Sequence, residues 1–263
     1  MKSSRQYTTL KSCKDFSYFD NLNEDSERVL VFFSGGYFDG SEINVIEKYL
    51  PKDLRILSPS YPGRGGTKPI RSFDSPINIA KILNEWLDSF DFKNKKVVLW
   101  GHSLGTAILN ELMLLTNIHV EKIILLTPGE FLKNPLINKP LIEVTEYFNK
   151  NPKPRNLFKE IIQKVYPFNY SFFKKSDSKS MNEQLEGIAE YKINTKKTFP
   201  QNTLIINCSD DILVEPSSLE KIHTIYPNYQ EETVKHEHII EVIGDEVFVG
   251  DMVNKYVNPF LNS

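Results

Sequence analysis

The residues best suited to chemistry lie in the pentapeptide Gly-His-Ser-Leu-Gly at residues 101–105. An apolar run at residues 97–100 precedes it, and apolar residues at 108, 112 and 115 follow it at helical spacing. A serine at such a strand-to-helix turn projects its hydroxyl above the sheet, and the flanking glycines leave room for a strained backbone. The free N–H groups at the start of the helix favour a developing negative charge. We therefore expect Ser103 to be a nucleophile and the N–H of Leu104 to donate to an oxyanion.

A serine nucleophile needs an imidazole to remove its proton, and the chain has five histidines. We expect His102, inside the turn, and His119 and His223, at helix ends, to be structural or solvated. His236 and His238 lie at the end of the last predicted strand and point the same way on an extended chain, so either could be the base. They could also form a metal-binding His-x-His pair, but further ligands at recognisable spacing are missing, and no metal is expected.

The imidazole in turn needs a carboxylate. Asp210 and Asp211 directly follow the apolar run at 202–207, and one of them can be the acid while the other serves the turn. Glu130, after the strand that ends at Leu126, is a less favoured acid. A second oxyanion donor is expected from residues 34–37, Ser-Gly-Gly-Tyr, where glycines let the backbone approach a substrate.

These residues must be positioned by a sheet, and the chain predicts one. Short apolar runs alternate with stretches of helical period, which indicates an α/β fold with a largely parallel sheet and helices on both faces. The interior runs are rich in Val, Ile and Leu, as in strands that are buried on both sides. Strands are expected at residues 15–19, 28–33, 54–58, 96–100, 122–126, 202–207 and 232–236, and helices at 79–90, 108–115 and 249–257, the last ending before Pro259.

Residues 131–200 break this rhythm. They hold amphipathic pieces at 141–148, 157–166 and 181–191, several prolines and many aromatic residues, and they are too long for a plain crossover. We expect a helical lobe inserted between two strands, whose aromatic side chains either line an apolar acyl pocket or pack the lobe onto the sheet.

Composition excludes several classes of protein. The chain has 263 residues, of which 40% are hydrophobic and 25% charged, as in ordinary globular domains. A net charge of -2 gives no global attraction to nucleic acid or anionic membrane. Two cysteines, Cys13 and Cys208, make a disulfide framework unexpected. Since no run resembles a signal peptide or a membrane span, we expect a cytoplasmic protein.

The serine turn, the glycine-rich exit of the 28–33 strand, the Tyr-Pro-Gly-Arg-Gly-Gly loop at 61–66 and the order serine, acid, histidine together resemble the α/β-hydrolase superfamily, with its serine esterases, lipases and thioesterases. The resemblance implies a mostly parallel eight-stranded sheet with a helical cap after the sixth strand. The core would then be 1–130 and 201–263, and the cap 131–200.

The resemblance also implies the roles of single residues. It selects Asp211 over Asp210 as the acid, and His238 over His236 as the base because of its distance from the helix near Glu246. The second oxyanion donor becomes the N–H of Tyr37, or of Gly36 if the loop is one residue shorter.

The function implied is hydrolysis of a carboxylic ester or thioester of a small molecule through an acyl-enzyme, without a cofactor. The loop at 61–66 is similar to that of thioesterases that unload carrier-bound acyl chains, which is one alternative. A non-catalytic ligand-binding member of the same fold is another.

Overall fold

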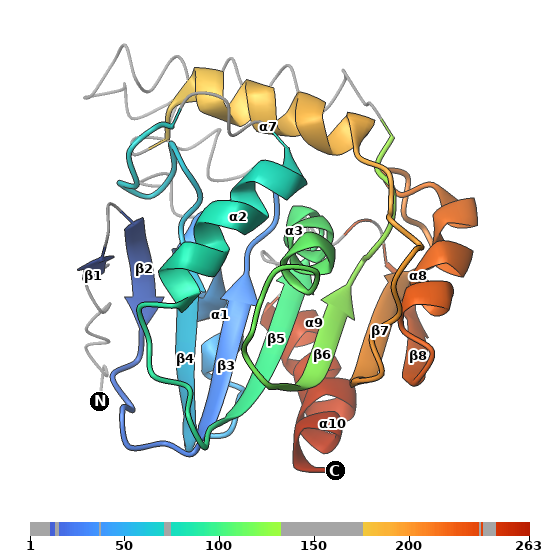
Figure 1. Ribbon diagram of the computed structural model, residues 1–263. Coiled ribbons are helices and arrows are strands. Elements are labelled where there is room, and N and C mark those ends of the chain that lie inside the picture. Colours follow the sequence, from blue (N-terminus) through green and yellow to red (C-terminus); the bar gives the residue numbers. More distant parts are fainter. Residues whose placement is uncertain are drawn as a thin grey trace, which may run out of the picture.

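The computed structural model describes residues 11–13, 16–36, 38–70, 75–132, 176–236, 238 and 246–263 (Figure 1). Its described strands form one eight-stranded sheet in the order β1-β2-β4-β3-β5-β6-β7-β8, in which the β1–β2 and β2–β4 pairs at one edge are antiparallel and the other five pairs are parallel. The strands are β1 Lys11–Cys13, β2 Phe16–Asp20, β3 Arg28–Phe33, β4 Leu54–Pro59, β5 Lys96–His102, β6 Val120–Leu126, β7 Asn202–Cys208 and β8 Tyr229–Val234. The predicted α/β fold with a mostly parallel sheet is confirmed.

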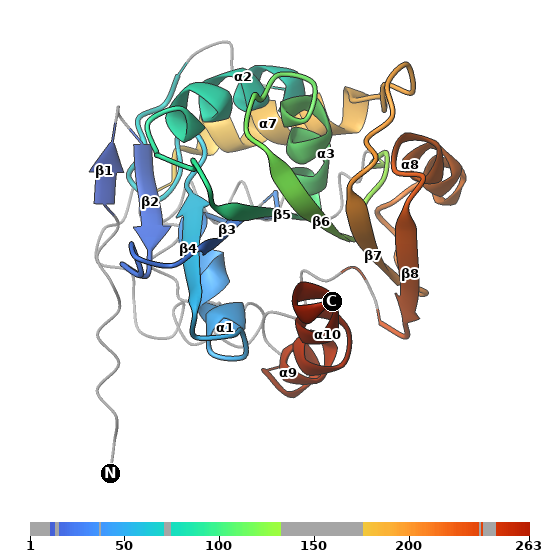
Figure 2. The same ribbon diagram turned by 60° about the horizontal axis from the view of Figure 1, so that its bottom comes forward.

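Helices cover both faces of this sheet. Figure 2 shows α2 and α3 on one face and α1, α9 and α10 on the other. The described helices are α1 Ile43–Glu47, α2 Pro76–Leu87, α3 Leu104–Leu112, α7 Ser178–Glu190, α8 Leu219–Ile225, α9 Glu246–Met252 and α10 Asn258–Asn262, with short 3-10 turns η1 Gly40–Glu42 and η2 Pro216–Ser218 and a π-helical turn η4 Val253–Val257. Among these described helices, none is long and apolar enough to cross a membrane.

The two faces correspond to two apolar cores, and the alternation along β3 shows how one strand serves both. Val31 and Phe33 face the core under α2 and α3, whereas Leu30 and Phe32 face the core under α1 and α9. Every residue between Val29 and Phe33 is buried, which explains the continuous apolar run in the sequence.

The last strand is β8 at Tyr229–Val234 and not at 232–236 as predicted. It forms an edge of the sheet, and most of its side chains are exposed and polar. An exposed edge strand carries little of the apolar signal by which strands are recognised in a sequence, so the prediction was drawn toward the buried Val234.

The C-terminal helix was predicted to end before Pro259, but it continues past this residue. The π-helical turn, in which the Asn258 N–H donates to the Val253 carbonyl, leads directly into α10. Pro259 then lies in the first turn of α10, where a backbone N–H is not needed to complete the helix.

The α7 helix runs above the carboxyl ends of the strands (Figure 1). It covers most of the third amphipathic piece predicted at 181–191, whereas the pieces at 141–148 and 157–166 lie outside the described residues. Asp177 caps α7 by accepting the Ser180 N–H at 2.8 Å, and the Asp177 N–H donates to the Gly63 carbonyl at 2.7 Å. The division into a core and a cap over 131–200 stays a prediction.

Candidate active site

Ser103 lies at the tight turn between β5 and α3, with φ 52° and ψ −117°. A positive φ is strained for any residue with a side chain. The two glycines of the pentapeptide are required by close packing. A Cβ atom on Gly105 would lie 2.0 Å from the Phe33 carbonyl oxygen, and one on Gly101 would lie 2.7 Å from the Gly105 carbonyl oxygen. The spacing of glycine, serine and glycine is therefore a consequence of packing a helix start directly against β3.

The hydroxyl of Ser103 lies within hydrogen-bond reach of His238, which is distant in the sequence. The distance from Ser103 Oγ to His238 Nε2 is 3.0 Å, and that from His238 Nδ1 to Asp211 Oδ2 is 2.8 Å. The other carboxylate oxygen of Asp211 accepts the N–H groups of Leu213 and Val214 at 2.8 and 3.1 Å. The His238 and Asp211 side chains are 4% and 9% exposed, so the three groups form a buried hydrogen-bonded chain.

The charge states of Asp211 and His238 follow from their surroundings. Burial raises the pKa of Asp211, but the hydrogen bond and charge of His238 and the two backbone N–H groups outweigh it and hold the pKa below its usual range. Burial lowers the pKa of His238, and this exceeds the opposing effect of Asp211, so the net shift is downward. At neutral pH the pair is a carboxylate beside a neutral imidazole, the state in which an imidazole can accept a proton.

The other histidines lie elsewhere. The His236 ring packs against Phe248 of α9, with 4.7 Å between ring centroids. His119 is exposed, and His223 pairs with Glu231 at 2.8 Å. Within the described ranges, no group of three or more His, Cys, Asp or Glu side chains is arranged to hold a metal ion.

The other two candidate acids, Asp210 and Glu130, make contacts with residues other than His238. The exposed carboxylate of Asp210 accepts the Ser209 hydroxyl at 3.0 Å. Glu130 is buried, but its carboxylate pairs with Lys192 and Lys221 at 2.9 and 2.6 Å, which attaches the segment after α7 to α8. Of the three candidate acids, the structure brings Asp211 to the imidazole.

The segments that carry two of the expected oxyanion donors, Leu104 and Gly36, lie side by side. Leu104 opens α3, so its N–H has no acceptor upstream in the helix. A Cβ atom on Gly36 would lie 3.8 Å from the Leu104 Cβ, so the 34–36 segment passes directly beside the start of α3. Tyr37, the other expected donor, lies outside the described residues.

Sequence reasoning missed the residues that brace this segment. The buried Tyr61 hydroxyl donates to the Ser34 carbonyl at 2.7 Å. The buried Arg64 guanidinium donates to the carbonyls of Gly35 and Phe38 at 3.4 and 3.3 Å. The Tyr-Pro-Gly-Arg-Gly-Gly loop is thus a support for residues 34–38. In the sequence this loop was marked by its resemblance to loops of the α/β-hydrolase superfamily, and its supporting contacts were not predicted.

Apolar side chains surround the site. Leu185 of α7 lies over the 34–36 segment, since a Cβ atom on Gly36 would be 3.5 Å from its Cδ2. The Phe131 ring meets the His238 ring edge to face, with 6.1 Å between centroids. The Gln184 amide fixes α7 by donating to the Pro62 carbonyl at 2.8 Å.

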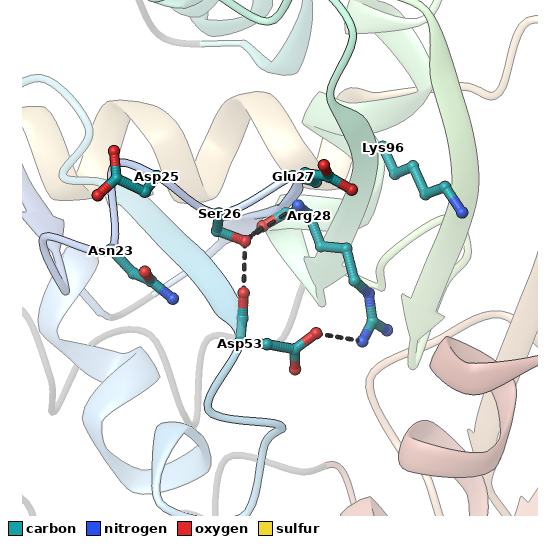
Figure 3. A pocket seen from close by; sticks show the side chains of 7 residues that line it. All are labelled: Asn23, Asp25, Ser26, Glu27, Arg28, Asp53 and Lys96. Atoms are coloured by element: carbon teal, nitrogen blue, oxygen red, sulfur yellow. Dashed lines mark hydrogen bonds and ion pairs between the residues drawn. The ribbon is translucent and has the colours of Figure 1, made fainter.

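A hollow lies at the other end of the parallel strands from Ser103, by the amino ends of β3 and β5 (Figure 3). It is lined by Asn23, Asp25, Ser26, Glu27, Arg28, Asp53 and Lys96. Arg28 pairs there with Asp53 at 2.9 Å and donates to the Leu261 carbonyl at 2.9 Å, which ties α10 to the sheet. These contacts are structural, and the hollow is remote from Ser103.

Comparison with known proteins agrees with this architecture. The model of the family described as "Alpha/beta hydrolase family" matches residues 30–186. No curated protein matches the chain significantly.

Solved structures share the fold. An esterase from Exiguobacterium antarcticum superposes with a TM-score of 0.67 at 15% identity, over 97% of this chain and 99% of that one. An enol-lactonase from Burkholderia xenovorans gives 0.69 at 14% identity, over 97% and 100%. A bromoperoxidase from Bacillus anthracis gives 0.69 at 16% identity, over 94% and 95%. At such identities the likeness extends to the fold alone.

Proposed function

This chain belongs to the alpha/beta hydrolase family, and on that premise we propose that it is a serine hydrolase of carboxylic esters or thioesters. Ser103 attacks the acyl carbon while His238 Nε2 accepts the hydroxyl proton, and Asp211 stabilises the imidazolium that forms. The N–H of Leu104, with that of Gly36 or Tyr37, donates to the oxyanion. His238 then returns the proton to the leaving alcohol or thiol, and water releases the acyl group by the same route.

One observation carries this proposal: the buried hydrogen-bonded chain from Ser103 through His238 to Asp211, with distances of 3.0 and 2.8 Å. A serine in ordinary packing needs neither the strained turn nor a neutral imidazole held by a carboxylate. These hydrogen bonds also argue against a purely ligand-binding protein, because binding alone needs no proton acceptor at the serine.

The substrate side of the proposal rests on the apolar surroundings. Phe131 and Leu185 flank the triad, so an uncharged acyl group fits the site better than a charged one. We assign substrate choice to the cap proposed at 131–200, to which both residues belong. The loop at 61–66 already has a structural role in bracing residues 34–38, so its sequence does not favour a carrier-bound thioester over a free ester.

The test compares the wild type with Ser103→Ala on aryl esters and acyl-CoA thioesters of matched chain length. We expect turnover of at least one series by the wild type, and a loss of about 10⁴-fold or more in the variant with its thermal unfolding unchanged. Equal rates for the two proteins would refute the mechanism. The ratio of ester to thioester turnover identifies the leaving group.

A further inference from the structure

A second buried carboxylate lies next to the triad without belonging to it. Glu42 ends the η1 turn, and its side chain is 1% exposed. One carboxylate oxygen lies 2.5 Å from His102 Nδ1, and the other accepts the Gly35 N–H at 2.8 Å. A carboxylate this deeply buried is retained only where hydrogen bonds compensate its desolvation, and here both partners lie at the site.

The two partners belong to the two segments, here called arms, whose N–H groups at Leu104 and Gly36 would together form an oxyanion hole. His102 immediately precedes Ser103, and Gly35 immediately precedes Gly36. The arms are in tight contact, since a Cβ atom on Gly35 would lie 3.0 Å from His102 Nδ1. The His102 ring is also stacked toward the His238 ring, with 6.4 Å between centroids. Glu42 therefore clamps the turn at residues 101–105 (the elbow) to the segment at residues 34–36 (the glycine loop), although Glu42 and His102 are 60 residues apart in the sequence.

The backbone groups of the glycine loop show what the clamp achieves. The Ser34 carbonyl accepts from Tyr61, the Gly35 carbonyl accepts from Arg64 and from the Phe38 N–H, and the Gly35 N–H donates to Glu42. Within the described part of the chain, the Gly36 N–H has no acceptor. The Gly35 carbonyl and the Gly36 N–H belong to one planar peptide group, so the hydrogen bonds of the carbonyl orient this N–H, and the bond to Glu42 holds the peptide group before it.

We infer that Glu42 is a positioning residue for oxyanion formation, which holds the Gly35 peptide against the elbow so that the Gly36 and Leu104 N–H groups converge on the same oxygen. The inference rests on the proposed function. It deepens that function by assigning a role to a group that touches neither substrate nor nucleophile.

Glutamine at position 42 tests this because it has the same size but only one accepting oxygen. In one orientation of the amide, its NH₂ group would face the Gly35 N–H, so that two donors meet. In the other, the NH₂ group would donate to His102 Nδ1, and His102 would then have to carry its proton on Nε2. That nitrogen is buried and has no hydrogen-bond partner in the described structure, so the second arrangement leaves a buried donor unsatisfied. Either way the clamp weakens while the volume stays the same.

The experiment compares Glu42→Gln and the shorter Glu42→Asp with the wild type. The matched control is Glu111→Gln, a buried carboxyl on α3 that accepts the Tyr191 hydroxyl at 2.9 Å outside the site. A fluorophosphonate that labels the active serine counts the competent sites in each sample. We then measure kcat and KM per titrated site, the second-order rate constant of labelling, and Tm.

We expect both Glu42 variants to lose about 10- to 100-fold in kcat per titrated site and in labelling rate, with KM nearly unchanged. Glu111→Gln should lower Tm and leave kcat, KM and the labelling rate unchanged. Wild-type rates per titrated site in both Glu42 variants, or failure of both to fold, would assign Glu42 to stability and overturn the inference.

Failure of the proposed function is distinguishable from failure of the inference. A wild type that is labelled but hydrolyses no ester or thioester would sink the proposed function, and the labelling rates of the variants would still decide the role of Glu42. A wild type that is not labelled would overturn both.

Discussion

Asp210 and Asp211 are neighbours in the sequence but have opposite environments: one is exposed, and the other is buried against His238. The pair therefore provides an isosteric test of the triad. Asp211→Asn should lower kcat by about 10⁴-fold, because the amide favours the wrong imidazole tautomer. Asp210→Asn should stay within about twofold of the wild type, as expected for an exposed residue. Comparable losses in the two variants, measured on one ester, would show that the acid is misassigned.

The pH dependence of activity follows from His238. Its pKa is lowered from the usual 6.5 by burial, against the opposing effect of Asp211. Only the neutral imidazole accepts the serine proton, so activity falls as the pH falls through this pKa. We expect the acidic limb of kcat/KM against pH to have its midpoint below 6.5 for an uncharged ester. Removing the Asp211 charge should move the midpoint further down, and a midpoint above 6.5 would contradict the burial of the ring.

The residues of the site differ in how far they could be predicted. Ser103 and Leu104 follow from the local pattern of a strand, glycines and a helix. Asp211 was chosen over Asp210, and His238 over His236, only through the resemblance to a family, because the local sequence does not distinguish the members of either pair. Glu42 could not be found, since its partners lie at residues 35 and 102 and a single acid in a polar turn is an ordinary occurrence.

Among the structural elements, the turn between β5 and α3 tolerates the least change. In Gly105→Ala the added methyl group would collide with the Phe33 carbonyl, a backbone atom that cannot move without disturbing β3. We expect a loss of about 3 kcal/mol or more in the free energy of unfolding, or failure to fold. Chemical denaturation measures it, with Ser103→Ala in the same turn as the control. A stability equal to that of the wild type would show that the helix is not packed this closely.

The elements themselves were predictable in proportion to their burial. The β3 strand has a nearly continuous apolar sequence because both of its faces are covered, and its bounds match the predicted 28–33. The β8 strand was misplaced because its exposed edge carries polar side chains. The extension through Pro259 depends on a π-helical turn, which sequence periodicity does not reveal.

For the whole molecule, the layered α/β architecture follows from the alternation of strands and helices along the chain and is confirmed by the sheet order. The long segment between β6 and β7 was expected to be helical, and its described part contributes α7 above the strand ends (Figure 1). The proposed roles of core and cap differ accordingly. We propose that the core supplies the catalytic triad and that the cap supplies Leu185 and Phe131 beside it.

The proposed mechanism requires the Ser103 hydroxyl to carry the acyl group during turnover. The most direct measurement mixes the protein with an excess of an activated aryl ester, quenches it in acid within milliseconds, and locates any added acyl mass by peptide mass spectrometry. We expect an acyl group on the peptide that contains Ser103, and none in Ser103→Ala. Ester turnover by a protein whose acyl group is found on another residue, or that survives in Ser103→Ala, would contradict it.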